Sequence, residues 1–252
     1  MSFIIIIPAR YDSTRLPGKL VKTINGKTIL EYVYACAKAS DATQVIIATD
    51  DQRIVEIAQG FGADVCLTAA SHTSGTQRLA EVVEQRQISP DAIIVNLQGD
   101  EPLMPAECIN QVAQLLQNDP AAVVATLCSP LESAADVFDS SIVKVVSDKH
   151  QHALYFSRAA IPWHREDFPT PPLSQTSVEY VRRHIGIYAY RAAYVQRYVQ
   201  LDPSPLEQIE SLEQLRVLWH GDKIAIAQAV KVPGPGVDTE EDLQQVAALL
   251  TH

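Results

Sequence analysis

The first apolar segment of the chain, Phe3-Ile4-Ile5-Ile6-Ile7, runs directly into Pro8-Ala9-Arg10-Tyr11-Asp12-Ser13-Thr14-Arg15-Leu16-Pro17-Gly18-Lys19. A short, wholly apolar run of this kind is typical of a strand buried on both faces of a parallel sheet. The polar residues after it then lie at the carboxyl edge of the sheet, where open α/β folds bind their ligands. This stretch therefore predicts both the fold class and the position of a binding loop.

Three cations in this loop, Arg10, Arg15 and Lys19, stand against a single anion, Asp12. The whole chain has 20 basic and 30 acidic residues and a net charge of -10, which argues against general nucleic-acid or acidic-membrane binding. A local positive pocket in an acidic chain indicates an anionic ligand rich in phosphate. The alternative is a solvated surface loop whose basic residues have no function.

Strand-like and helix-like segments alternate along the first half of the chain. Apolar runs at 3–7, 45–49, 65–68, 93–97 and 123–127 predict strands, and amphipathic stretches at 28–39, 51–60, 76–87 and 106–117 predict helices. Four strand-helix units in series favour an α/β fold with a doubly wound, mostly parallel sheet.

The alternation changes after Pro130. Strands are expected at 142–146, 153–157, 184–190 and 223–229, helices at 206–220 and 239–250, and a long irregular loop at 162–177. We interpret residues 1–252 as a single α/β domain. Within it, the stretch from about 130 to 200 is expected to form a smaller, mixed inserted subdomain or dimer arm.

The cysteines Cys36, Cys66, Cys108 and Cys128 are widely spaced and form no Cys-x-x-Cys pair. They indicate small apolar residues of a reducing compartment, and neither a disulfide frame nor a zinc site. The first apolar run is too short for a signal peptide, and no stretch approaches the ~20 apolar residues of a membrane helix. The sequence thus predicts a cytoplasmic protein with no membrane partner.

Neither of the common glycine motifs for phosphate is present. The pairs Gly18-Lys19 and Gly26-Lys27 lack the glycine that a P-loop requires five positions earlier, and no Gly-x-Gly-x-x-Gly follows the first strand. Phosphate must then be held by side chains and turn amides, with Arg as a bidentate fork and Lys as a point charge. The missing fingerprint also argues against an NAD-dependent reductase.

A carboxylate follows the fourth predicted strand, in Asn96-Leu97-Gln98-Gly99-Asp100-Glu101-Pro102. If the first and fourth strands are neighbours, Asp100 lies near the basic loop, and Mg²⁺ takes one or two carboxylates together with phosphate oxygens and water. Asp238 becomes a second ligand if it lies beside Asp100. The alternatives are a turn residue for Asp100 and a helix N-cap for Asp238, a position for which Thr239 with Asp242 competes.

Other polar residues have both a structural and a functional interpretation. Ser74-Gly75-Thr76 opens a helix, so its amides and hydroxyls contact a base or ribose or only cap the helix. His184 and Tyr188 are four apart on a strand and share a face, where such residues are usually structural. Glu213 and Gln214 are, by default, part of a solvated helix face.

Eight motifs in this order resemble those of one family. They are Ile-Pro-Ala-Arg-Tyr-x-Ser-Thr-Arg-Leu-Pro-Gly-Lys, Ala-Thr-Asp-Asp, Ser-Gly-Thr-x-Arg, Asn-Leu-Gln-Gly-Asp-Glu-Pro, Ala-Leu-Tyr-Phe-Ser-Arg, Arg-His-Ile-Gly-Ile-Tyr, Leu-Glu-Gln-Leu-Arg and Val-Asp-Thr. Together they resemble the 3-deoxy-manno-octulosonate cytidylyltransferase (CMP-Kdo synthetase) family over essentially the whole chain. The first motif is shared by several sugar nucleotidyltransferases, whereas the combination is far more specific.

The resemblance implies that CTP and 3-deoxy-manno-octulosonate (Kdo) give CMP-Kdo and pyrophosphate, with Mg²⁺ as cofactor, for lipopolysaccharide biosynthesis. It also implies a nucleotide-diphospho-sugar transferase-like fold and a homodimer formed through the later strands and helices. By position, it assigns Arg10, Arg15 and Lys19 to the CTP phosphates, with Lys19, Arg15 and Asp100 as catalytic residues. It assigns Ser74, Thr76, Arg78 and Gln98 to the nucleotide, Asp100 and Asp238 to Mg²⁺, and Arg158, His184, Tyr188, Glu213 and Gln214 to the sugar acid.

Two departures from the family pattern are visible. The family usually has Pro where this chain has Leu20, which bears on the stiffness of the loop, and acidic residues where it has Ser71 and Gln77. The alternatives to this function are a related cytidylyltransferase for an 8-amino sugar acid or sialic acid, and a non-catalytic nucleotide-binding regulator on the same fold.

Overall fold

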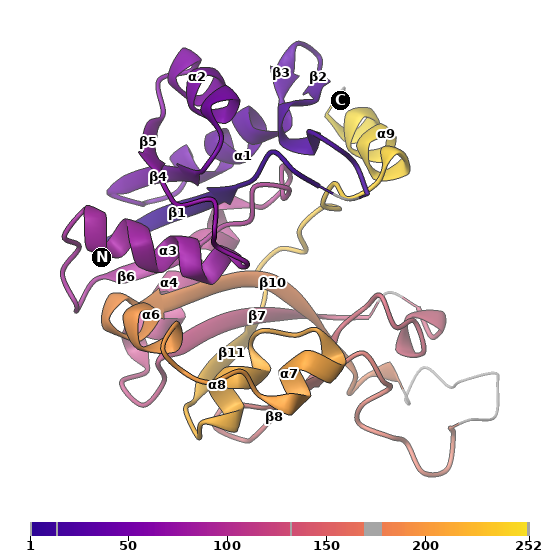
Figure 1. Cartoon of the computed structure of the whole chain (residues 1–252). Coiled ribbons are helices and arrows are strands. Elements are labelled where there is room, and N and C mark those ends of the chain that lie inside the picture. Colours follow the sequence, from indigo (N-terminus) through magenta and orange to yellow (C-terminus); the bar gives the residue numbers. More distant parts are fainter. Residues whose placement is uncertain (1, 14, 132, 169–177, 251–252) are drawn as a thin grey trace.

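The computed structural model describes residues 2–13, 15–131, 133–168 and 178–250. In these ranges a nine-stranded sheet runs through the molecule in the order β11-β7-β10-β6-β1-β4-β5, and β8 and β9 extend it from β10 (Figure 1). Its strands are β1 Phe3–Ala9, β4 Gln44–Thr49, β5 Asp64–Leu67, β6 Ile93–Asn96, β7 Val124–Pro130, β8 Lys144–Ser147, β9 Ala153–Ser157, β10 Arg182–Arg191 and β11 Ile224–Gln228. Along the main order only the pairings of β10 are antiparallel, so the predicted mostly parallel α/β fold is confirmed.

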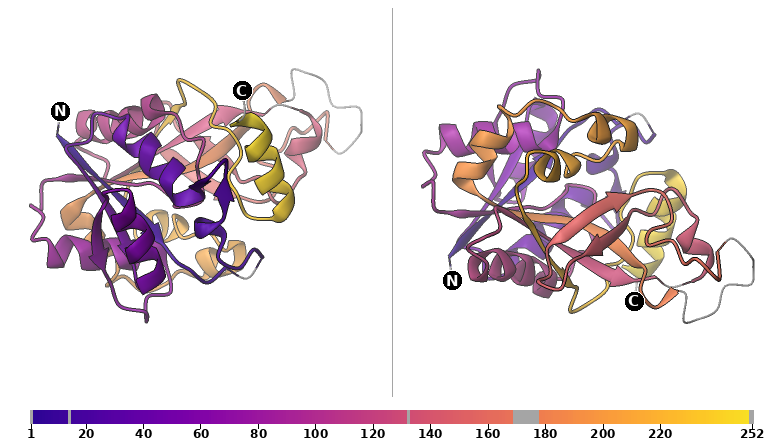
Figure 2. Two further views of the ribbon diagram at one scale, coloured as in Figure 1. Left: turned by 90° about the horizontal axis from the view of Figure 1, so that it is seen from above. Right: turned by 90° about the horizontal axis from the view of Figure 1, so that it is seen from below.

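Helices cover both faces of the sheet, as the two views of Figure 2 show. They are α1 Ile29–Lys38, α2 Gln52–Gly60, α3 Gly75–Gln85, α4 Ala106–Asn118, α6 Ala192–Tyr198, α7 Pro205–Glu210, α8 Leu215–Trp219 and α9 Glu240–Leu249, with short 3-10 turns η1 Lys19–Val21 and η2 Ala135–Val137 and a small hairpin of β2 Thr23–Ile24 and β3 Lys27–Thr28. The first four helices confirm the predicted ones to within two residues. Among the described residues, no helix is long and apolar enough to cross a bilayer.

Side-chain caps explain where the early helices begin. The side chains of Thr28, Asp51 and Ser74 each accept a backbone N–H from the first turn of α1, α2 and α3, respectively. Each cap satisfies one of the N–H groups that a helix start leaves without a partner inside the helix. The local sequence therefore fixes these three boundaries.

The central pairing of the sheet joins β1 to β6 in parallel, with Phe3 opposite Ile93 and Ile6 opposite Asn96. The first and fourth predicted strands are therefore neighbours, as the sequence analysis required. Because parallel strands end at the same edge, the loop after β1 and the loop after β6 emerge side by side. This pairing sets the position of the site described below.

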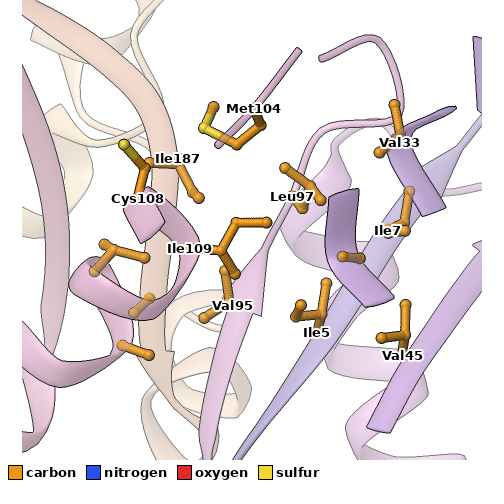
Figure 3. Packing of buried hydrophobic residues seen from close by; sticks show 14 of the residues in the cluster. Ile5, Ile7, Val33, Val45, Val95, Leu97, Met104, Cys108, Ile109 and Ile187 are labelled. Atoms are coloured by element: carbon orange, nitrogen blue, oxygen red, sulfur yellow. The ribbon is translucent and has the colours of Figure 1, made fainter. Parts of the chain in front are cut away.

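Two apolar cores form, one on each face of the sheet. Figure 3 shows part of the first core, where Ile5, Ile7 and Val95 from β1 and β6 pack near Val33 of α1 and Ile109 of α4. The alternate residues of the same strands, such as Ile6 and Ile94, face the second core under α3, α6 and α8. The period-two alternation of a strand thus supplies both cores, which is why the first apolar run has no polar residue.

Strand β10, which lies between β6 and β7 in the sheet, is irregular. Opposite β7, Ile185 pairs with Leu127 but Tyr188 pairs with Thr126, so Gly186 and the residue after it form a β-bulge. The bulge bends the strand and redirects the side chains on either side of it. The rings of His184 and Tyr188 still contact each other, with centroids 5.4 Å apart.

The prediction of one continuous helix over residues 206–220 is wrong. Helix α7 ends at Glu210, Ser211 has the left-handed backbone φ 53°, and α8 begins at Leu215. Because Leu212 and Leu215 are buried on either side of the break, the apolar periodicity continues through it and the sequence pattern does not reveal it. The break forms a turn at residues 211–214 that faces the candidate site.

The stretch from about 130 to 200 supplies β8, β9 and most of β10. Beside these strands lies a small separate apolar cluster of Val137, Phe168, Val178 and Val181. The predicted loop 162–177 has no helix or strand as far as Phe168, and its part from 169 to 177 lies outside the described residues. The inserted-subdomain or dimer-arm role of this stretch stays a prediction.

After β11 the chain crosses the molecule to α9 through an extended segment, residues 229–238, which we call the C-terminal strap (Figure 1). Its Val237 N–H donates to the carbonyl of Asp100 at 2.8 Å, and its Gly234 N–H donates to the carbonyl of Leu103 at 3.4 Å. A Cβ on Gly234 would lie 2.7 Å from Leu103 Cδ1 and 2.8 Å from Leu103 Cβ. Only glycine therefore allows the strap to approach this closely.

We predict that Gly234→Ala lowers the free energy of unfolding by about 1–3 kcal/mol, because the added methyl group overpacks a contact whose Cβ atom cannot rotate away. Gly60→Ala is the matched control, since a Cβ there meets nothing within 4 Å. Thermal unfolding followed by circular dichroism measures both variants. Equal melting temperatures for the two would contradict the predicted contact.

Candidate active site

A cleft of about 380 Å³ opens at the carboxyl edge of the sheet. The loop after β1, the start of α3 and the loop after β6 form most of its wall, and the C-terminal half of the chain completes it. Of the residues predicted from the sequence, Arg10, Arg15, Lys19, Ser74, Gln98, Asp100, Glu213 and Asp238 line this cleft. The basic loop and the two distant carboxylates therefore meet at one site.

The ammonium group of Lys19 lies at the centre of the charged part of the cleft. Its Nζ donates to Asp100 Oδ2 at 2.5 Å and to Asp238 Oδ1 at 2.8 Å. Burial acts to lower the pKa of Lys19, but the charges and hydrogen bonds of both carboxylates outweigh burial and raise the pKa above its ordinary value. The ammonium form of Lys19 is therefore favoured, and it supplies one of the two positive charges, with Arg15, that face the two carboxylates.

The backbone before Lys19 makes this placement possible. Gly18 has φ 65° and precedes the 3-10 turn η1, and its N–H donates to the carbonyl of Tyr11. Glycine adopts this left-handed conformation without the steric cost that other residues have. The turn directs the side chain of Lys19 back across the loop toward the carboxylates.

Asp238 does not cap the last helix. Thr239 is the N-cap of α9 and forms a capping box with Asp242, whose carboxylate also accepts the backbone N–H of Asp238. The side chain of Asp238 is thus free to contact Lys19, and also Arg15, whose Nη2 lies 2.9 Å from Asp238 Oδ2. Of the two alternatives from the sequence, the cap belongs to Thr239.

Arg10 and the start of α3 form the opposite wall of the cleft. Arg10 Nη2 is buried and has no hydrogen-bond partner among the described residues. A buried guanidinium nitrogen without a partner is costly, so this atom suits an anionic ligand. Nearby, Ser74 caps α3 and Gln77 accepts the Thr73 N–H at 2.7 Å, so the amide Gln77 serves here to order the segment before the helix.

A second cavity of about 200 Å³ adjoins the cleft and shares Gly75, Gln98 and Glu213 with it. Its wall consists mainly of hydroxyl and amide groups. Of the residues predicted from the sequence, Thr76, Tyr188, Glu213 and Gln214 line it together with Gln98. A cleft lined by several charged side chains and a polar cavity whose one acidic residue is Glu213 therefore lie in direct contact.

Hydrogen bonds connect the walls of the two cavities. Gln98 Nε2 donates to Asn96 Oδ1 at 3.4 Å, and Thr76 Oγ1 donates to Glu213 Oε2 at 3.1 Å. The buried side chain of Tyr190 lines the same cavity as Thr76 and Asn96. Asn96 and Tyr190 were not identified from the sequence, although the alternation of Tyr188 and Tyr190 on a predicted strand is a signal that they share a face.

Glu213 stands at the junction of the cleft and the second cavity. It lines both of them, and burial of its carboxylate raises its pKa, an effect that the Thr76 hydrogen bond and the charges of Arg216 and Arg10 partly oppose. The break between α7 and α8 is what turns this side chain inward. A continuous helix would present it with the solvated face that the sequence suggested.

His184 lines neither the cleft nor the second cavity, unlike Tyr188. It lines a small pocket of about 70 Å³ with Glu101, Ser129 and Arg183, and its ring packs edge-on against Phe156 with centroids 5.0 Å apart. Burial lowers the pKa of His184 to about 3, so the imidazole is neutral at physiological pH.

Besides His184, two predicted ligand contacts, Arg78 and Arg158, line neither the cleft nor the second cavity. Arg78 is fully buried beneath the cleft, where it bonds to Thr68 and pairs with Asp50 at 3.1 Å. Arg158 donates to the backbone carbonyls of Glu210 and Ser140. In this chain both arginines hold neighbouring segments together, and their ligand roles stay predictions.

The carboxylates of Asp100 and Asp238 fit a divalent cation. Both reach the same ammonium group, so they converge on one point of the cleft, and two carboxylates with ligand phosphates and water are the donors that Mg²⁺ takes. In the described ranges, no group of three or more His, Cys, Asp and Glu side chains gathers as a complete metal site. The neighbouring carboxyl group of Glu101 is not counted with Asp100 and Asp238 as a candidate ligand. Burial and the charge of Asp100 raise the pKa of Glu101 to about 7.

The departure from the family pattern at Leu20 has a structural role. Leu20 is buried, and a Cβ on Gly99 would lie 3.1 Å from its Cδ1 atom. The side chain therefore packs against the glycine of the loop after β6 and holds η1 beside that loop.

These features define a class: an α/β nucleotide-binding protein whose cleft at the sheet edge is built for a polyphosphate. The chain belongs to the cytidylyltransferase family, whose model matches residues 4–224, and it is a nucleotidyltransferase.

Individual relatives narrow the comparison. The 3-deoxy-manno-octulosonate cytidylyltransferase of Psychromonas ingrahamii is 56% identical over 255 residues, with 100% of both chains covered, and that of Yersinia enterocolitica is 55% identical over 252 residues at the same coverage. These matches confirm the resemblance to the 3-deoxy-manno-octulosonate cytidylyltransferase family that the motifs indicated.

Two solved structures are similar to this chain over nearly its whole length. A CMP:2-keto-3-deoxy-manno-octonic acid synthetase complexed with CTP is 42% identical, has a TM-score of 0.90, and is matched over 100% of this chain and 99% of its own. A 4-diphosphocytidyl-2C-methyl-D-erythritol synthase, 14% identical over 99% of this chain and 98% of its own with a TM-score of 0.63, shares the fold.

We predict that the ring signals of His184 show no titration between about pH 5 and 8, because burial lowers its pKa to about 3. Between pH 3 and 6.5 the unfolded chain then binds more protons than the folded one, so the contribution of this residue to stability falls as the pH is lowered through that window. NMR of histidine-labelled protein measures the titration, with His184→Gln for assignment. A midpoint near 6.5 would show that water reaches the ring freely.

Proposed function

We propose that this protein transfers CMP from CTP to the anomeric hydroxyl of Kdo and releases pyrophosphate. The product, CMP-Kdo, then serves lipopolysaccharide biosynthesis. The names of relatives that match over the full length support this activity, and so does the cytidylyltransferase family of the chain.

One observation carries the proposal: the charged cleft and the polar second cavity adjoin and share the wall residues Gly75, Gln98 and Glu213. The cleft has the cations that a triphosphate requires, and the cavity has the hydroxyl and amide groups that suit a polyhydroxy acid. Two substrates bound in this way lie next to each other. Holding two reactants in position is a major part of what such a transfer needs.

The chemistry is an in-line attack of the anomeric hydroxyl on the α-phosphorus of CTP, with pyrophosphate as the leaving group. Arg10, Arg15 and Lys19 would bind the phosphates and stabilise the charge that develops on them. Ser74, Thr76 and Gln98 would contact the nucleotide, and Tyr188, Glu213 and Gln214 would orient the sugar acid. No covalent intermediate with the protein is required.

Asp100 and Asp238 would hold Mg²⁺ in this proposal. A bound Mg²⁺ neutralises phosphate charge and lowers the pKa of a coordinated hydroxyl. The convergence of both carboxylates on Lys19 Nζ supports this role, because the two groups already share one counter-charge. Their own part is to stay fixed in direction while the ligands bind.

Two further proposals concern the setting of the reaction. A homodimer is supported by large apolar side chains that are exposed in the later part of the chain, among them Leu154, Trp163 and Tyr180. A cytoplasmic location is supported by four cysteines that are all free thiols. The homodimer follows what the family resemblance implied, and the location follows what the sequence composition predicted.

We predict pyrophosphate release that requires CTP, Kdo and Mg²⁺ together, measured with a coupled pyrophosphate assay. ATP, GTP and UTP in place of CTP test the base, and sialic acid or an 8-amino sugar acid in place of Kdo tests the acceptor. Preference for another acid would assign the related cytidylyltransferase function. Binding of CTP without pyrophosphate release with any acid would indicate the non-catalytic regulator.

We predict that Asp100→Asn lowers turnover by about 10²–10³-fold, the scale for loss of one electrostatic contact in a transition state, while the melting temperature changes little. Asp222→Asn is the matched control, because Asp222 precedes β11 at the opposite edge of the sheet and binds Tyr194 and Arg197. Steady-state kinetics compare the two. Near-normal turnover of Asp100→Asn would refute its catalytic role.

A further inference from the structure

A single threonine lies under the β-bulge of β10. Thr126 on β7 is fully buried, and its Oγ1 lies 2.8 Å from the Ile187 carbonyl oxygen, 3.1 Å from the Ile185 carbonyl oxygen and 3.0 Å from His184 Nε2. Three polar groups of the irregular segment therefore depend on one hydroxyl. None of the roles discussed above uses Thr126.

The number of hydrogens available on each group decides which atom donates in these three contacts of Thr126. A hydroxyl has one hydrogen to donate and two lone pairs to accept with. The carbonyl oxygens of Ile185 and Ile187 can only accept, so the Thr126 hydrogen goes to one of them, and the shorter contact is with Ile187. His184 Nε2 must then be the donor, because two acceptors facing each other would repel.

The neighbouring aromatic rings hold the imidazole of His184 in the orientation in which Nε2 faces Thr126. Phe156 packs edge-on against the imidazole, and Tyr188 contacts it with ring centroids 5.4 Å apart, so the ring cannot turn freely. The ring is neutral, as its depressed pKa indicates, so it carries one proton. With that proton on Nε2, the other nitrogen, Nδ1, has a free lone pair.

Nδ1 is the nitrogen that remains for a ligand. Among the residues that the structure describes, none hydrogen-bonds to it, and it is not one of the buried polar atoms that lack a partner. His184 lines a small pocket of its own, and its ring contacts that of Tyr188, which lines the second cavity. An acceptor nitrogen there matches a hydroxyl group and repels a carboxylate oxygen.

We propose that Thr126 is a positioning residue that fixes the tautomer and orientation of His184, so that Nδ1 accepts a hydrogen bond from a hydroxyl group of the acceptor substrate. This inference rests on the proposed function for the identity of that substrate, a polyhydroxy acid. It assigns His184 to a hydroxyl and not to the carboxylate of the acid. The tautomer itself is a property of the free protein.

NMR of protein labelled with ¹⁵N in histidine tests the tautomer without any ligand, and His184→Gln identifies the signal among the 7 histidines. We expect one protonated nitrogen, Nε2, and one unprotonated nitrogen, Nδ1, at neutral pH. Thr126→Ser keeps the hydroxyl and should keep this pattern, whereas Thr126→Val removes it and should shift the ring toward the Nδ1–H form. A wild-type ring protonated on Nδ1, or on both nitrogens, would overturn the inference.

Steady-state kinetics test the ligand contact. Thr126→Val should raise the KM for the sugar acid by about tenfold, the factor that corresponds to loss of about one hydrogen bond, and should leave the KM for CTP nearly unchanged. Thr126→Ser should restore the KM for the acid. Thr49→Val is the control for removing a buried threonine hydroxyl, since Thr49 is fully buried on β4 and its hydroxyl accepts only the local Asp51 N–H among the described residues.

The two measurements separate this inference from the proposed function. If the wild-type protein shows the expected tautomer but no pyrophosphate release with any sugar acid, the proposed function fails and the assignment of the tautomer stands. If release occurs but Thr126→Val changes both KM values equally or neither, the contact with the acceptor is overturned. If Thr126→Val does not fold, the wild-type and Thr126→Ser spectra still decide the tautomer.

Discussion

The ion cluster of Lys19, Asp100 and Asp238 is the constraint on which the site depends. Two carboxylates that both contact one ammonium group would repel each other if that group were absent. The cluster forms because β1 and β6 are neighbours, because Gly18 allows the turn before Lys19, and because the C-terminal strap bonds to the loop after β6. Three segments far apart in the chain are therefore joined by charge at one edge of the sheet.

Much of this arrangement could be predicted from the sequence, since it follows from local patterns. The apolar runs define the parallel strands, and parallel strands must end at a common edge, so the polar residues after β1 and β6 had to be close together if those strands paired. The caps Thr28, Asp51 and Ser74 are equally local. Which residue of Asp238 and Thr239 caps α9 was left open, because both residue types suit that position.

What the sequence could not reveal depends on tertiary packing. The break at Ser211 leaves the apolar period intact, so it is invisible to periodicity, yet it turns Glu213 from a solvated helix face into the wall shared by both cavities. The β-bulge in β10 likewise depends on its partner Thr126, which no pattern in β10 itself indicates. Arg78 appears polar and available in the motif, but it is fully buried in a pairing with Asp50.

The position of Lys19 between Asp100 and Asp238 also couples the binding of an anion in the cleft to the binding of a cation. A polyphosphate that attracts the ammonium group takes away the counter-charge of Asp100 and Asp238. Under the proposed function a dication would restore that counter-charge, so the anion and the dication would each favour the binding of the other, and by reciprocity to the same extent. In the protein itself Lys19 and Arg15 supply two positive charges against the two carboxylates, so these four side chains together carry no net charge.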